Sequence, residues 1–120
     1  MSEPTVPATP AAASLVSIGD FKRFDLRVAR VLEARPHPNA DRLILLKVDV
    51  GAEQKQIIAG VRAWYPPETL VGRLVIVVNN LEPAMLRGEE SNGMLLAATS
   101  GDQVIFLTPE RDALPGSKIS

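Results

Sequence analysis

Hydrophobic and polar residues alternate in short runs along most of this chain, which is the pattern of β-strands. Residues 26–35 predict a long first strand, and its alternation breaks at Ala29 and Arg30, which indicates a β-bulge in a bent strand. Four further strands and a short last one are predicted over residues 43–50, 55–59, 74–78, 93–98 and 104–107. Residues 74–78 are apolar throughout, so we expect this strand to be buried on both faces.

Two short helical segments accompany the predicted strands. Residues 17–24 carry apolar side chains at helical spacing, and Ser17 is a suitable N-cap for them. Residues 66–70 begin with two prolines, which suit the first turn of a helix, so we expect one short helical turn there.

The order of these elements predicts an all-β fold, a five-stranded OB-fold barrel with short helices. In such barrels the loops between strands 1 and 2 and between strands 4 and 5 bind oligonucleotides or oligosaccharides. Here those loops are residues 37–42 and 80–94, which we expect on the same side of the barrel. The barrel is predicted over residues 15–120, because residues 1–14 are rich in proline and alanine and indicate a flexible tail or linker.

Composition and charge narrow the function. The chain has a formal net charge of −1, one histidine and no cysteine. We therefore expect no disulfide and no metal site, and the lack of cysteine fits the reducing cytoplasm. No apolar run approaches the roughly 20 residues that span a membrane. No nucleophile, acid–base pair or ligand cluster is evident, so we expect a protein that is not an enzyme and needs no cofactor.

The most informative chemistry lies in residues 80–94, which suit contact better than catalysis. Arg87 lies between Leu86 and Gly88. A guanidinium can bind a phosphate or a base edge with two hydrogen bonds, and the glycine permits close approach of the backbone. The alternative is a solvated arginine paired with a neighbouring glutamate, and spacing alone does not separate the two.

Five other residues are candidate nucleic-acid contacts, each with a structural alternative. Ser91 and Met94 could present a hydroxyl and a soft apolar surface to an unstacked base, although spacing alone favours a turn residue and core filler. Arg42 ends the 1–2 loop and either reaches the same groove or is a strand-edge charge. Arg27 and Arg30 on the first strand either line the binding face or point to solvent.

Several motifs appear together along the folded region. They read His-Pro-Asn-Ala-Asp-Arg-Leu, Asn-Leu, Leu-Arg-Gly, Glu-Ser-Asn-Gly-Met, Leu-Thr-Pro and Pro-Gly-Ser-Lys, at residues 37–43, 80–81, 86–88, 90–94, 107–109 and 115–118. With these motifs, residues 18–118 resemble the tRNA-binding domain found at the C-terminus of bacterial methionyl-tRNA synthetases and in free-standing structure-specific tRNA-binding proteins. No single motif is specific, but together they cover essentially the whole predicted domain in the family's order.

The resemblance implies a non-catalytic module that holds tRNA by its shape, mainly at the outer corner, and assists an aminoacyl-tRNA synthetase, in the first place the methionyl enzyme. It implies a homodimer with two grooves. It places the family's binding residues at Arg42, Asn80, Arg87, Ser91 and Met94. A rival interpretation is a dimeric, chaperone-like OB-fold protein that binds peptides, which Met85 and Met94 favour because methionine surfaces adapt to varied apolar partners.

The sequence departs from the family pattern just before Arg87. The family usually has a basic run there, similar to Lys-Pro-Arg-Lys, whereas residues 82–85 read Glu-Pro-Ala-Met. Affinity for nucleic acid depends strongly on neutralised phosphates. We therefore expect tRNA binding that is weaker and less salt-dependent than in a typical member. Ala29 also replaces the family's glycine in the first strand.

Overall fold

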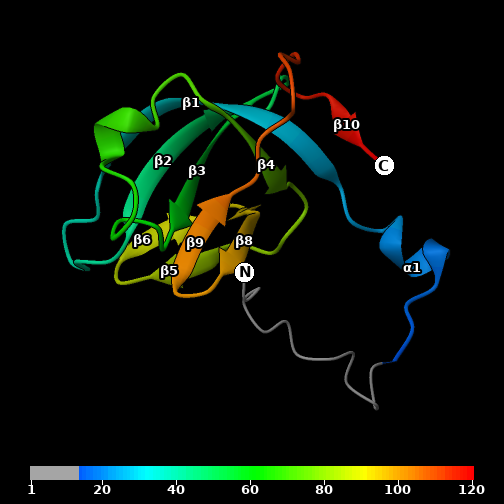
Figure 1. Ribbon diagram of the computed structural model, residues 1–120, viewed down its shortest axis with the longest axis horizontal. Coiled ribbons are helices and arrows are strands. Elements are labelled where there is room, and N and C mark those ends of the chain that lie inside the picture. Colours follow the sequence, from blue (N-terminus) through cyan, green and yellow to red (C-terminus); the bar gives the residue numbers. More distant parts are fainter. Residues whose placement is uncertain (1–13) are drawn as a thin grey trace.

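The computed structural model describes residues 14–120, which form a nearly closed antiparallel barrel (Figure 1). The barrel strands, paired in the order β3–β2–β1–β4–β7, are β1 (Leu26–Pro36), β2 (Ile44–Asp49), β3 (Gln54–Ala59), β4 (Leu74–Val78) and β7 (Met94–Leu95). The predicted all-β, OB-type barrel is confirmed. The predicted tail falls outside the described residues, apart from its last position.

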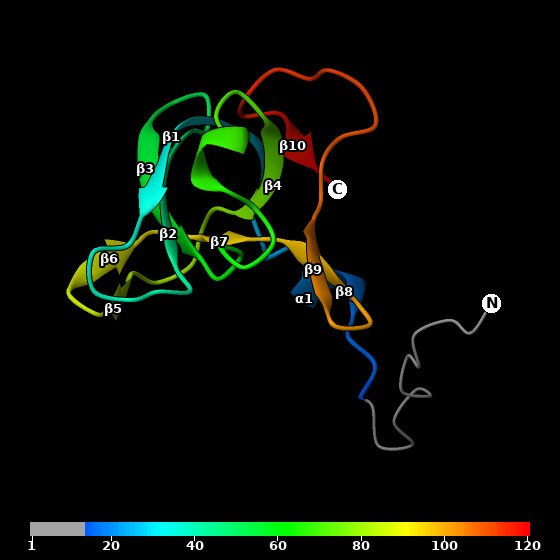
Figure 2. The same cartoon turned by 60° about the vertical axis from the view of Figure 1, so that its left-hand side comes forward.

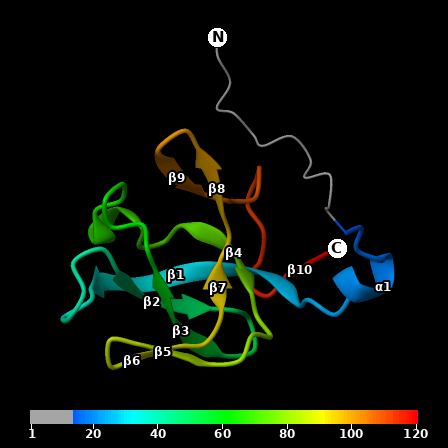
Figure 3. The same cartoon turned by 90° about the horizontal axis from the view of Figure 1, so that it is seen from below.

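The remaining helices and strands are short. They are α1 (Ile18–Phe21), η1 (Pro67–Thr69), β5 (Ala84–Leu86), β6 (Glu89–Ser91), β8 (Ala97–Ser100), β9 (Gln103–Phe106) and β10 (Lys118–Ile119). The β5–β6 hairpin lies beside β2 and β3, whereas the β8–β9 hairpin projects away from the barrel (Figures 2 and 3). Among the described residues, no helix is long and apolar enough to cross a membrane.

The long first strand, β1, forms hydrogen-bonded pairs with strands in both halves of the barrel. Its first part pairs with β4 and its second part with β2, and the register with β2 shifts between Val31 and Glu33. The predicted bulge is therefore present, but its predicted position at Ala29 and Arg30 was wrong. Val28 and Ala29 are both buried for another reason. Ala29 faces the core cluster, and the C-terminal segment lies against Val28, with the Gly116 N–H donating to the Val28 carbonyl at 2.7 Å.

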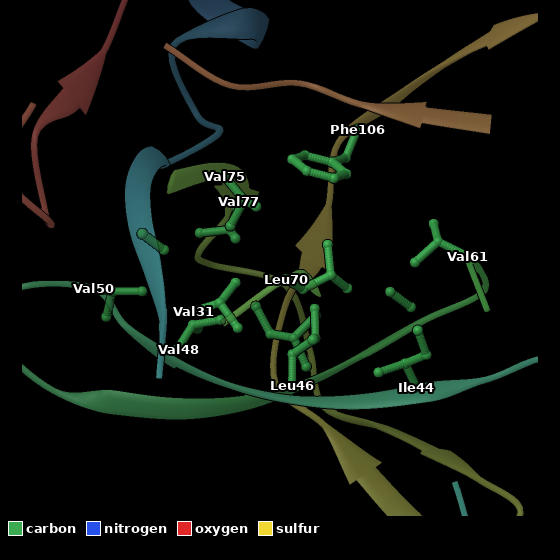
Figure 4. Close-up of a cluster of buried hydrophobic side chains, with 13 residues drawn as sticks. Val31, Ile44, Leu46, Val48, Val50, Val61, Leu70, Val75, Val77 and Phe106 are labelled. Atoms are coloured by element: carbon green, nitrogen blue, oxygen red, sulfur yellow. The ribbon is translucent and has the colours of Figure 1, made fainter. Parts of the chain in front are cut away.

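Aliphatic side chains from the barrel strands fill the interior, as Figure 4 shows. Leu70, which follows η1, packs into this cluster, and Phe106 of β9 joins it. In β4, Val75 and Val77 are fully buried, but Leu74 and Ile76 are only partly covered. The expectation that both faces of this strand are buried was thus only partly right, because Leu74 and Ile76 alternate with the core residues.

Three further predictions have definite outcomes. Ser17 caps α1 as expected, its Oγ accepting the Asp20 N–H at 3.0 Å, although the helix ends earlier than predicted. The predicted helical turn is η1. The single strand predicted over residues 93–98 was wrong, because the chain divides at Leu96 into β7, which completes the barrel, and β8, which leaves it.

Candidate nucleic-acid interface

The segment predicted as the 4–5 loop is a short β-hairpin with Arg87 at its tip. Leu86 pairs with Glu89, so Arg87 and Gly88 form a two-residue turn, and their φ angles are 53° and 88°. Two positive φ values define a type I′ turn, which favours Asn-Gly. Arg87 is the one non-glycine residue with positive φ among those described, and this conformation costs roughly 1–2 kcal/mol.

The guanidinium of Arg87 is available for a ligand. The residue is exposed, and within residues 14–120 its side chain makes no hydrogen bond or ion pair. The predicted alternative, pairing with a neighbouring glutamate, is not what the structure shows, since Glu89 instead accepts from the Gln56 amide at 3.2 Å. A strained backbone at an exposed arginine makes Arg87 a candidate functional residue.

The 1–2 loop holds this tip through the backbone. The buried ring of His37 bonds through Nε2 to the Leu86 carbonyl at 2.9 Å. Asn39 donates from Nδ2 to the Arg87 carbonyl at 3.3 Å. The two predicted binding loops therefore meet on one side of the barrel, as expected. Arg42 is exposed on the same 1–2 loop.

The base of the hairpin is fixed to β3. Ser91 is 4% exposed, and its Oγ accepts the Ile58 N–H at 3.0 Å and donates to the Gly93 carbonyl at 3.1 Å. Gln56 donates to the Glu90 carbonyl at 3.0 Å. Both hydrogen-bonding roles of the Ser91 hydroxyl are thus used within the fold, and its surroundings leave little access for a base.

An open groove of about 340 Å³ lies on β1, β2 and β3. Its lining is mixed in charge and polarity: Arg35, Lys47 and Lys55, one carboxylate at Glu33, the amides Gln54 and Gln56, and Leu45 with Leu46. Lys47 is half exposed and lies 3.5 Å from Glu33, an exposed pair that contributes little to stability. Cations and amides on this face of an OB barrel suit a nucleic-acid backbone.

The sequence prediction missed this groove, although one signal was available. Lys47 is the out-of-phase residue in a strand whose inward positions are Ile44, Leu46 and Val48, so alternation alone marks it as outward-facing. Its neighbour Arg35 lies opposite Leu45 in the β1–β2 ladder. The register shift in β1 hid that pairing from the sequence.

Arg27 and Arg30 lie on β1 with their guanidinium groups engaged within the fold. Arg27 donates to Asp25 at 2.6 Å and to the Gly116 carbonyl at 3.1 Å. Arg30 donates to the Gly72 carbonyl at 2.8 Å. None of these hydrogen bonds joins Arg27 or Arg30 to the hairpin tip.

Asn80 and Asp25 join the end of β4 to the start of β1. The Asn80 amide accepts the Asp25 N–H at 2.8 Å and donates to the Arg23 carbonyl at 2.7 Å. A hydrogen bond from the Asn79 side chain, together with the hydrogen bond and charge of Arg27, holds the pKa of Asp25 below its usual value, although burial opposes this shift. Asn80 thus anchors the segment that follows α1.

Met94 lies on β7 opposite Val78 and is 48% exposed. It lines a small hollow with Ile58, Val61 and Val104. Met85 on the outer strand of the hairpin is 66% exposed. The interface therefore combines three cations with two soft apolar side chains. Within residues 14–120, Arg42 and Arg87 have no ion-pair partner, whereas Lys47 is paired with Glu33.

Comparison with known proteins identifies the family. Residues 26–118 match the family model "Putative tRNA binding domain". Over 115 residues the chain is 49% identical to a methionine–tRNA ligase of Thermotoga maritima. This match covers 96% of this chain and 18% of the ligase. The chain thus spans less than a fifth of that relative's length.

Two solved structures share the fold over their whole lengths. A MetRS related protein from Pyrococcus horikoshii is 32% identical with a TM-score of 0.85, covering 90% of this chain and 100% of that one. The chaperone CsaA from Bacillus anthracis is 30% identical with a TM-score of 0.82, covering 89% of this chain and 100% of that one.

Proposed function

Because this chain belongs to the tRNA-binding domain family, we propose that it is a non-catalytic module that binds tRNA by shape and assists an aminoacyl-tRNA synthetase. The observation that carries the proposal is Arg87, an exposed and unpaired arginine held in a strained turn at the hairpin tip. A structural role would not require arginine at a position that favours asparagine or glycine.

Arg87 and Arg42 are the proposed phosphate contacts, and Lys47 with Arg35 extends the cationic surface along the groove. A guanidinium or ammonium at a phosphate contributes affinity without reading sequence, which fits recognition by shape. Ser91 and Asn80 support this surface from within the fold, and Met94 offers an apolar contact beside it. Arg27 and Arg30 would act only if tRNA displaced their internal bonds.

Methionyl-tRNA synthetase is the proposed partner, in cis or in trans, and the cytoplasm the proposed location. The support is the relationship to methionine–tRNA ligases, which are enzymes of translation. The chain spans only a small share of such a ligase, so the synthetase activity itself belongs to other domains of that relative.

A homodimer is the proposed assembly. Its support, besides the family resemblance, is a set of apolar side chains that the barrel leaves uncovered around α1: Leu15, Val16, Ile18, Phe21 and Phe24. No residue of α1 is buried, although the helix contains Ile18 and Phe21. A second copy would cover this face. Sedimentation of the wild type and of Phe21→Asp tests this, and a wild type that stays monomeric at high concentration refutes it.

Peptide binding is the second candidate function. It is favoured by the 66% exposure of Met85 and by the similarity to a structure named as a chaperone. One pair of titrations separates the candidates, using a fluorescent methionine tRNA transcript and a carboxymethylated, permanently unfolded protein. Saturable tRNA binding that weakens in Arg87→Asn supports the first candidate. Binding of the unfolded protein alone supports the second.

A further inference from the structure

The tip of the β5–β6 hairpin is fixed by two side chains from a loop almost 50 residues earlier in the chain. His37 bonds to the Leu86 carbonyl at 2.9 Å, and Asn39 bonds to the Arg87 carbonyl at 3.3 Å, so consecutive carbonyls are both held. The hairpin needs such support, because an isolated two-stranded hairpin is marginally stable in water. Its strands have only three residues each.

The hydrogen bonds of His37 assign its tautomer. The Asn39 N–H donates to Nδ1 at 2.9 Å, so Nδ1 must accept. The Leu86 carbonyl can only accept, so Nε2 must carry the proton. His37 is 3% exposed and both of its nitrogens are used within the fold. It therefore has no position from which to touch a ligand, and whatever it does for binding must act through the hairpin.

We propose that His37 and Asn39 are positioning residues, which keep Arg87 in its left-handed conformation and so set the affinity for tRNA without contacting it. This proposal rests on the proposed function, because it assumes that Arg87 is the contact. Loss of the bond to the Leu86 carbonyl would let the strained tip relax, and the guanidinium would no longer be held where the phosphate lies.

Two substitutions at His37 each remove a different one of its two hydrogen bonds. In His37→Gln the side-chain NH2 can reach the Leu86 carbonyl, as Nε2 does, but nothing replaces Nδ1. In His37→Asn the amide oxygen can take the Asn39 N–H, as Nδ1 does, but the link to the hairpin is lost. Each variant gives up one hydrogen bond, so they form a matched pair, and thermal unfolding of both verifies that they fold.

The experiment measures the affinity of a methionine tRNA transcript across a range of salt for the wild type, both His37 variants, Arg87→Asn and the double variant His37→Asn/Arg87→Asn. We expect His37→Asn to weaken binding about tenfold, similarly to Arg87→Asn, while His37→Gln stays near the wild type. We also expect His37→Asn to lower the salt slope by about one phosphate contact, roughly 0.7 to 0.9. The double variant should bind no worse than Arg87→Asn.

Equal effects of His37→Asn and His37→Gln, or additive effects in the double variant, overturn the positioning role while leaving the tRNA function intact. A wild type that does not bind tRNA, or an Arg87→Asn variant that binds normally, overturns the proposed contact and the positioning role with it. If His37→Asn does not fold, Asn39→Ala replaces it, because it removes the bond to the Arg87 carbonyl from an exposed loop residue. Unchanged binding and salt slope in Asn39→Ala would then overturn the proposal.

Discussion

The hydroxyl of Ser91 accepts the backbone N–H of Ile58 at 3.0 Å and so bonds the β5–β6 hairpin to a barrel strand 33 residues earlier. Ile58 lies directly opposite Leu45, and both are buried although they stand outside the main core cluster. The hairpin is thus docked on the outer face of β2 and β3, where Gln56 also bonds to Glu89 and Glu90.

Ser91→Ala should lower the free energy of unfolding by about 1–3 kcal/mol, because the buried Ile58 N–H loses its partner. Urea unfolding checks this. Ser100→Ala is the control: Ser100 is exposed at the end of β8, and its loss should change stability by less than about 0.5 kcal/mol. Equal stability of the two variants would contradict the account of Ser91.

Arg87→Asn should leave the protein as stable as the wild type or raise the free energy of unfolding by up to about 1 kcal/mol, because asparagine tolerates positive φ better than arginine. The same urea unfolding series measures this effect. Arg111→Asn is the control, an exposed arginine outside the hairpin that should leave stability unchanged. A clear destabilisation by Arg87→Asn would mean that its side chain supports the fold.

Asp25 should make the protein sensitive to acid. Its pKa in the folded protein is lowered from 3.8, chiefly by the Asn79 hydrogen bond and then by Arg27. A lowered pKa stabilises the fold at pH values above the pKa of Asp25 in the unfolded chain. This contribution is lost as the pH falls through the pKa of Asp25 in the folded protein. Between about pH 6 and about pH 3, Asp25→Asn should therefore lose less stability than the wild type.

Unfolding by urea at several pH values measures this difference. The control is Asp102→Asn, since Asp102 is exposed in the turn between β8 and β9. A difference confined to Asp25→Asn assigns the effect to the Asp25 carboxyl rather than to the loss of any one surface charge. If the free energy of unfolding falls with pH in parallel for the wild type and Asp25→Asn, Asp25 does not contribute to the acid sensitivity.

Gly116 lets the C-terminal segment lie against the barrel. A Cβ at this position would lie 2.7 Å from the Val50 carbonyl oxygen, and φ is 90°. Gly72 has a similar φ of 86° but open space around it. Gly72→Ala should therefore show the backbone cost alone, about 1 kcal/mol, and Gly116→Ala should cost at least about 1 kcal/mol more. Equal losses in thermal or urea unfolding would contradict this packing.

The sequence predicted most of the barrel because β2, β3 and β4 each carry a signal of their own. Alternation in β2 and the wholly apolar β4 needed no tertiary information. The first strand was harder, since Ala29 faces the core while its neighbour Val28 is covered by the distant Gly116 segment, and two consecutive apolar residues resembled a bulge. The β5–β6 hairpin was missed because its turn has arginine where the usual hairpin signal has asparagine.

The interface could be predicted only in part. Arg87 and Arg42 were predicted as contacts and stay predictions, although both are exposed in the structure, and Lys47 could have been added to them from its phase in β2. Ser91 and Asn80 have the residue types of ligand contacts, and only the folded structure reveals that their polar atoms bond to the Ile58 N–H and the Arg23 carbonyl. The bond from His37 to the Leu86 carbonyl spans 49 residues, and no local pattern predicts it.

The most direct test is a salt titration of tRNA binding by the wild type, Arg87→Asn and Arg111→Asn. We predict saturable binding by the wild type with a shallow salt dependence, because residues 82–85 lack the basic run of the family. Arg87→Asn should bind about tenfold more weakly and Arg111→Asn should match the wild type. No tRNA binding by the wild type, or equal binding by wild type and Arg87→Asn, would contradict the claim that the hairpin tip holds tRNA.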